Sequence, residues 1–185
     1  TLPLVPAIVD AMTKAVQEMG KAETFRGYGP EQGYDFLRKA IIEGDYKPYG
    51  IEIGMDEVFV SDGAKSDVGN IQELFSEDNI IAITDPVYPV YLDSNVMGGR
   101  TGQAVDGMFE KVVYLPTFAE NNFSPEFPAE RVDIVYLCSP NNPTGTVLSR
   151  ARLAEWIKWC KRNDAILMFD SAYFACTFDF IDRFN

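Results

Sequence analysis

The stretch Asp133-Ile134-Val135-Tyr136-Leu137-Cys138-Ser139-Pro140-Asn141-Asn142-Pro143-Thr144-Gly145 joins a continuous apolar run to a polar turn. The run 133–138 is typical of a short strand that is buried on both faces. In the segment 142–145, proline fixes the backbone while the preceding asparagine presents an amide side chain. The stretch therefore predicts a core strand that ends at a turn-forming, polar edge.

Other apolar runs alternate with helical patterns on both sides of this stretch. Short strands are predicted at 58–60, 80–83, 112–115 and 165–169. Helices are predicted at 64–75, at 91–96 and after Ser149, a candidate N-cap that is followed by a stripe of Leu153, Trp156, Ile157 and Cys160. This alternation predicts an α/β fold: a mostly parallel central sheet with helices on both faces.

The N-terminal part has a different pattern. Apolar residues at helical spacing predict a helix over 6–19, with Gly20 at its C-terminal end. A loop rich in glycine and aromatic residues follows, and then a second helix that we expect to end near Gly44. We expect residues 1–44 to form N-terminal helices and a dimer-side loop, and residues 45–185 to form the main α/β domain.

Composition excludes several classes of function. The 185 residues carry a formal net charge of −12, which argues against a nucleic-acid partner. Since no apolar run approaches the roughly 20 residues that span a bilayer, and no signal-peptide pattern opens the chain, we expect a protein of the cytoplasm or plastid stroma with no membrane partner. The absence of histidine removes imidazole-based catalytic and zinc sites, so no metal site is predicted.

Two further features have structural explanations. The three cysteines, Cys138, Cys160 and Cys176, are widely spaced and are expected to be core thiols rather than disulfide partners. The glycine cluster 98–102 lacks the Gly-x-Gly-x-x-Gly spacing, so a dinucleotide-binding domain is disfavoured.

Polar segments follow four of the predicted strands, where ligands collect in sheets of this kind. They are Ser61-Asp62-Gly63-Ala64-Lys65, Asp85-Pro86-Val87-Tyr88-Pro89, the segment 139–145, and Asp170-Ser171-Ala172-Tyr173. Each segment alone can be explained as a turn, a helix start or a cap. In this order, however, they resemble the fold-type I pyridoxal-phosphate enzymes, and the aminotransferases in particular.

Within that family, three segments resemble those of the LL-diaminopimelate aminotransferases, and the likeness runs from about residue 2 to residue 173. The segments are Phe25-Arg26-Gly27-Tyr28-Gly29-Pro30-Glu31-Gln32-Gly33, Val60-Ser61-Asp62-Gly63-Ala64-Lys65 and Asp85-Pro86-Val87-Tyr88-Pro89-Val90-Tyr91. The resemblance implies pyridoxal 5′-phosphate as cofactor, and it implies a homodimer.

The resemblance also implies which residues contact the cofactor ring. Asp170 pairs with the pyridine nitrogen, and its carboxylate favours the protonated ring. Tyr88 stacks on the ring. The Asn142 amide and the Tyr173 hydroxyl donate to the phenolic oxygen.

The phosphate end is assigned in the same way. Ala64 and Lys65 open a helix and contact the cofactor phosphate, while Tyr28 reaches the phosphate of the partner subunit. The resemblance also places Lys65, Tyr88 and Asn142 beside the substrate.

The implied reaction moves an amino group from LL-2,6-diaminopimelate to 2-oxoglutarate and gives tetrahydrodipicolinate and glutamate, a step of lysine biosynthesis. No lysine follows Lys161, so the family's Schiff-base lysine has no counterpart and no catalytic residue is assigned. We therefore expect a truncated chain that is inactive as given. Two alternatives stay open: a non-catalytic domain that binds or interacts, and an aminotransferase for another amino acid.

Overall fold

The computed structural model describes residues 3–174. The chain divides into two compact units, Thr1–Val60 and Ser61–Asn185. The sequence analysis divided the chain into residues 1–44, with a dimer-side loop, and residues 45–185, the main α/β domain. That assignment of roles to the two parts stays a prediction.

Two helices dominate the first unit. α1 (Pro6–Met19) has a proline in its first turn and Gly20 after its last residue, as predicted. α2 (Asp35–Ile41) runs into a π-helical turn, Ile42–Tyr46, and a 3₁₀ turn, Lys47–Tyr49. The prediction that this helix ends near Gly44 is therefore wrong. Gly44 stays helical, and the chain leaves the helical path at Gly50, whose positive φ of 69° suits glycine.

The prediction of a strand at 58–60 is also wrong. A short 3₁₀ turn, Met55–Glu57, precedes this segment. Val58 is extended and Val60 donates from its amide to the Gln32 carbonyl at 3.0 Å, but in the described part of the chain the segment pairs with no strand. Because apolar character alone does not supply a pairing partner, the segment forms no ladder.

The second unit is built on a four-stranded parallel sheet. Its strands are β1 (Ile81–Asp85), β4 (Val112–Pro116), β5 (Ile134–Cys138) and β6 (Ile166–Asp170), in the order β4-β1-β5-β6. The register pairs Ile83 with Tyr136 and Val135 with Leu167. The parallel sheet predicted from the apolar runs is thus confirmed.

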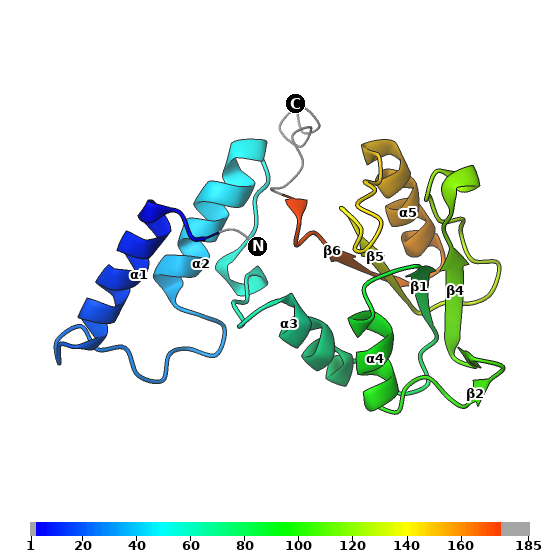
Figure 1. Ribbon diagram of the computed structural model, residues 1–185, viewed down its shortest axis with the longest axis horizontal. Helices are drawn as coiled ribbons and strands as arrows, with labels where there is room; N and C mark the ends of the chain where they lie inside the picture. The colour runs from blue at the N-terminus through cyan, green and yellow to red at the C-terminus, as the bar shows by residue number, and fades with distance from the viewer. Residues whose placement is uncertain (1–2, 175–185) are drawn as a thin grey trace. The chain divides into compact units, whose positions relative to one another are not determined.

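Helices cover both faces of this sheet (Figure 1). α3 (Ala64–Asn70), extended by a 3₁₀ turn (Ile71–Leu74), and α4 (Val90–Met97) pack on one face, where Ile83 and Tyr136 are buried. α5 (Arg150–Arg162) packs on the other face, where Trp156 lies against Val135 and Leu137. Successive residues of each strand therefore enter opposite cores, which explains the continuous apolar runs.

Ser149 caps α5 as predicted, since its hydroxyl accepts a hydrogen bond from the Arg152 amide at 3.1 Å. Cys138 and Cys160 are buried free thiols, as predicted, and Cys176 lies outside the described residues. No helix within residues 3–174 combines the length and the apolar character needed to cross a bilayer.

The structure adds a small hairpin that the sequence reading missed. β2 (Ala104–Val105) pairs antiparallel with β3 (Met108–Phe109), and a short 3₁₀ turn (Ala119–Asn121) follows β4. Asp106 and Gly107 between the two strands have φ values of 50° and 83°. Two positive φ values are the signature of a tight hairpin turn, and the Asp-Gly pair was the signal for it.

Candidate functional site

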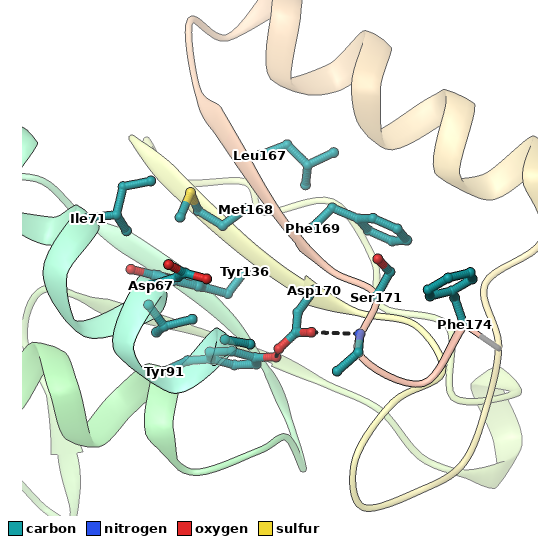
Figure 2. A pocket seen from close by; sticks show the side chains of 13 residues that line it. Asp67, Ile71, Tyr91, Tyr136, Leu167, Met168, Phe169, Asp170, Ser171 and Phe174 are labelled. Carbon is teal, nitrogen blue, oxygen red and sulfur yellow. Dashed lines mark hydrogen bonds between the residues drawn. The ribbon is translucent and has the colours of Figure 1, made fainter. Parts of the chain in front are cut away.

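A cavity of about 480 Å³ lies at the carboxyl end of β6 in the second unit (Figure 2). Its walls come from α3, α4, β5, β6 and the turn after β6. Cavities of roughly 300 to 1,000 Å³ are typical of small-molecule sites. The lining includes Ala64, Asp67, Tyr91, Tyr136, Asp170 and Ser171.

Asp170 supplies a fixed carboxylate to this cavity. One of its oxygens, Oδ1, accepts a hydrogen bond from the Ala172 amide at 3.0 Å, in a turn typical of aspartate. The other, Oδ2, accepts a hydrogen bond from the Tyr91 hydroxyl at 2.6 Å. Figure 2 shows the Asp170 carboxylate next to the Tyr91 side chain. Each oxygen keeps a further lone pair for another donor.

Tyr91 belongs to a buried aromatic pair beneath the carboxylate. Its ring stacks on Tyr136 with a centroid distance of 5.3 Å and an interplanar angle of 17°. Asn95, one turn further along α4, donates to the Tyr91 carbonyl at 2.7 Å and to the Tyr136 hydroxyl at 3.3 Å. Burial, and then the hydrogen bond to Asp170, raises the pKa of Tyr91 far above its ordinary value. The phenol therefore stays protonated and donates.

Two neighbouring groups share this apolar environment. Burial raises the pKa of the Tyr136 hydroxyl and of the Cys138 thiol. The Cys138 thiol lies at the end of β5, with its sulfur 3.2 Å from the Pro140 carbonyl. The Tyr136 hydroxyl and the Cys138 thiol therefore stay protonated beside the two carboxyl side chains of the cavity lining, Asp67 and Asp170.

The start of α3 forms another part of the wall. Gly63 has a φ of 142°, a conformation that side chains rarely adopt, and it lies directly before the helix. The Gly63 carbonyl accepts hydrogen bonds from the amides of Ser66 and Asp67 at 3.0 and 3.3 Å. Ala64 and Lys65 thus occupy the first helical positions, and their amides precede the intrahelical ladder.

Lys65 and Tyr88 meet at the same side of the unit. The Lys65 Nζ lies 5.9 Å from the centroid of the Tyr88 ring. Tyr88 in turn makes an edge-to-face contact with Tyr91, at 6.0 Å and 86°. A chain of contacts therefore connects Lys65, through two tyrosines, to the Asp170 carboxylate.

Three further residues predicted from the sequence lie in turns and loops. Asn142 follows β5 in a half-buried turn, and Tyr173 follows β6 with 45% of its surface exposed. Tyr28 is fully exposed in a loop of the first unit. Within residues 61–174, the cavity lining includes Ala64 and Asp170 but not Lys65, Tyr88, Asn142 or Tyr173.

The turn after β5 nevertheless touches the turn after β1. Asn141 donates from its side-chain amide to the Pro86 carbonyl at 3.2 Å. It also donates to the Thr144 hydroxyl at 2.9 Å. Two of the polar segments identified in the sequence are thus joined at one edge of the sheet.

The sequence reading assigned no role to Tyr91 or Tyr136. Tyr91 closes the segment 85–91 that carries part of the family resemblance, three residues after Tyr88, and this was an available signal. Tyr136 lies inside a continuous apolar strand, where no local pattern distinguishes a residue that lines a cavity from one that fills the core.

Comparisons with known proteins show what this chain is similar to. The model of the family "Aminotransferase class I and II" matches residues 4–184. A Methanosphaera stadtmanae protein named LL-diaminopimelate aminotransferase is 61% identical over 174 residues, and a Parabacteroides distasonis protein of that name is 58% identical over 175 residues. The solved LL-diaminopimelate aminotransferase of Chlamydomonas reinhardtii superimposes with a TM-score of 0.85 at 40% identity.

These matches include nearly all of this chain but less than half of each relative. They cover 94%, 95% and 95% of the chain, and 42%, 43% and 43% of the three relatives respectively. The chain therefore spans somewhat over two fifths of the length of the proteins that it matches.

Proposed function

Because the chain belongs to the class I and II aminotransferase family, we propose that it forms the cofactor-binding part of an aminotransferase that acts on LL-diaminopimelate and 2-oxoglutarate. Members of this family use pyridoxal 5′-phosphate. The observation that carries the proposal is the Asp170 carboxylate, fixed by two hydrogen bonds at the end of β6 and facing a cavity of small-molecule size.

The residues present fit this cofactor. A carboxylate with free lone pairs beside a pyridine nitrogen favours the protonated ring. When bound, the cofactor supplies an electron sink for the charge left when the substrate's α-proton departs. Asp170 would hold the proton at the ring nitrogen, and Tyr88 would stack on the ring. Asn142 and Tyr173 would donate to the phenolic oxygen.

The phosphate would lie at the start of α3. The amides of Ala64 and Lys65 precede the helical ladder, and the Lys65 ammonium adds a positive charge. Lys65 would also bind a substrate carboxylate when the substrate is present, next to Tyr88 and Asn142. LL-diaminopimelate carries two carboxylates, which is consistent with a cationic residue at this position.

A second copy of the chain would complete the site. Tyr28 has no burial in its own unit, and α1 buries none of its side chains. Exposed apolar surface of this kind favours a partner surface. In the proposed homodimer, the Tyr28 hydroxyl donates to the cofactor phosphate of the partner.

The binding test uses a stable adduct in which the cofactor is joined to the amino acid by a reduced C–N bond. Calorimetric titration of the 185-residue chain should show saturable binding of the adduct of LL-diaminopimelate. The adduct of leucine should bind roughly tenfold more weakly, the difference expected from one lost charge-assisted contact. If the chain bound neither adduct, the proposal would be wrong. Equal affinity for both would favour another substrate.

Variants separate the roles of the residues. Asp170→Asn should change the protonation of the bound pyridine, followed by its absorption spectrum against pH, more than it changes affinity. Tyr28→Phe should lower affinity for a phosphorylated probe while sedimentation shows an unchanged dimer. A monomer at all concentrations would contradict the proposed homodimer.

A further inference from the structure

Asp170 and Tyr91 are 79 positions apart in the sequence, yet their side chains form a short hydrogen bond in the cavity wall, at 2.6 Å. A carboxylate accepts, so the hydroxyl of Tyr91 is the donor. Tyr91 is only 1% exposed, whereas Asp170 is half-buried at the end of its strand. The rigid partner in this contact is therefore the tyrosine.

Two contacts hold the Tyr91 ring, which stacks on Tyr136 and meets the edge of Tyr88. The Tyr91 backbone carbonyl also accepts a hydrogen bond from Asn95. Since a tyrosine ring has few torsions to rearrange, these contacts fix the position of its hydroxyl. Figure 2 shows this ring pointing its hydroxyl at the Asp170 carboxylate.

The Asp170 carboxylate is then fixed at both oxygens, by the Tyr91 hydroxyl at Oδ2 and by the Ala172 amide at Oδ1. Rotation of the carboxylate about its last torsion would break both hydrogen bonds. The direction of its remaining lone pairs is thus set by the wall of the cavity.

We propose that Tyr91 is a positioning residue, whose hydroxyl aims the Asp170 carboxylate at the pyridine nitrogen of the bound cofactor. This inference rests on the proposed function. Tyr91 also connects Asp170 to Tyr88 through the edge-to-face contact, so one buried ring sets the relative position of the pyridine partner and the stacking ring. The raised pKa of Tyr91 keeps the donor protonated over the working pH range.

The test compares two probes, pyridoxamine 5′-phosphate and its deaza analogue, in which a C–H replaces the ring nitrogen. The 185-residue chain should prefer the pyridine probe, and the ratio of the two affinities measures the interaction of the nitrogen with Asp170. Tyr91→Phe keeps the ring and removes the hydroxyl. It should reduce this ratio by roughly fivefold, the effect of about one hydrogen bond.

A double-mutant cycle identifies the path of the effect. In an Asp170→Asn background, Tyr91→Phe should leave the ratio unchanged, because the group that it positions is gone. Tyr114→Phe is the matched control. It removes another partly buried hydroxyl of the sheet, which contacts the Phe109 amide at 3.4 Å, and it should leave the ratio as in the original chain.

The outcomes distinguish the inference from the proposed function. If neither probe binds the original chain, the proposed function fails. If the chain prefers the pyridine probe and Asp170→Asn removes the preference, but Tyr91→Phe does not reduce it, the inference is overturned and the proposed function stands. An equal loss for both probes in Tyr91→Phe also overturns it, since the hydroxyl would then serve stability alone.

A second variant keeps the inference testable if Tyr91→Phe does not fold. Replacement of Tyr91 by 3-fluorotyrosine keeps the hydroxyl but makes it a stronger donor. It should withdraw charge from Asp170 and lower the pKa of the bound pyridine nitrogen, as measured by the absorption of the bound probe against pH. An unchanged pKa of that nitrogen would overturn the inference.

Discussion

The Lys65 ammonium lies 5.9 Å from the centroid of the Tyr88 ring, which joins the start of α3 to the turn before α4. Contacts of this kind contribute about 0.5 to 1 kcal/mol at exposed sites. The contact is therefore weak as a source of stability. Its importance is geometric, because it places a cation beside the ring that we propose to stack on the cofactor.

This relationship gives a prediction for phosphate binding. Lys65→Met should lower the affinity for pyridoxamine 5′-phosphate by roughly tenfold, since a charge-assisted contact is lost. It should change the affinity for pyridoxamine, which has no phosphate, much less. Calorimetric titration of both compounds provides the comparison. Lys65→Arg keeps the charge and is the control, and an equal loss for both compounds would contradict a contact with the phosphate.

Asp133 gives a prediction for acid stability. Burial opposes its ionisation, but hydrogen bonds from the Ile80 amide at 2.8 Å and from Arg131 at 2.6 and 3.1 Å hold the pKa of its carboxyl below the usual value. The unfolded chain then binds the proton more readily than the folded one. The stabilisation is fully present above about pH 4, near the pKa of an unfolded aspartate, and is lost as the pH falls through the folded pKa.

Asp133→Asn should therefore lower the free energy of unfolding at neutral pH and make its decline in acid less steep. Urea denaturation at a series of pH values measures both effects. Asp106→Asn is the control, because Asp106 is exposed in a hairpin turn that asparagine also accepts. A parallel acid decline in the original chain and in Asp133→Asn would show that this carboxyl contributes nothing to the pH dependence.

The cap of α5 is a third test. Ser149→Ala removes the hydroxyl that accepts from the Arg152 amide, and it should lower the free energy of unfolding by about 1 kcal/mol. Ser149→Asp should restore most of this loss. Urea titration followed by tryptophan fluorescence suits the measurement, because both tryptophans of the sequence, Trp156 and Trp159, lie on α5. An unaltered midpoint in Ser149→Ala would exclude a stabilising cap.

Substitution of Trp156 measures how much the core on the α5 face of the sheet contributes to stability. The Trp156 side chain has no exposed surface, and it packs edge-on against Phe127 at a centroid distance of 4.7 Å. Trp156→Ala should lower the free energy of unfolding of the second unit by about 3 to 5 kcal/mol. Trp156→Phe should cost clearly less, since most of the apolar volume remains and the indole N–H has no hydrogen-bond partner in the described part of the chain. Similar losses in both variants, measured by circular dichroism in urea, would contradict this account.

Much of the second unit was predictable because neighbouring residues encode it. The apolar runs before Asp85, Ser139 and Ser171 are strands, and Ser149 caps the helix that follows. Local patterns failed where a segment depended on a partner elsewhere. Val60 lies in an apolar run, but its amide donates to the Gln32 carbonyl of a loop, and Gly44 continues a helix that a glycine was expected to end.

The sequence by itself determined where β1, β5 and β6 end and which polar residues follow them, since side-chain periodicity and turn chemistry are local properties. Only the tertiary structure decided that β6 lies beside β5, that α4 covers their common face, and that the Tyr91 hydroxyl consequently meets Asp170. The physical reason is that strand order and helix packing arise from contacts between residues far apart in the chain, and no pattern of neighbours contains that information.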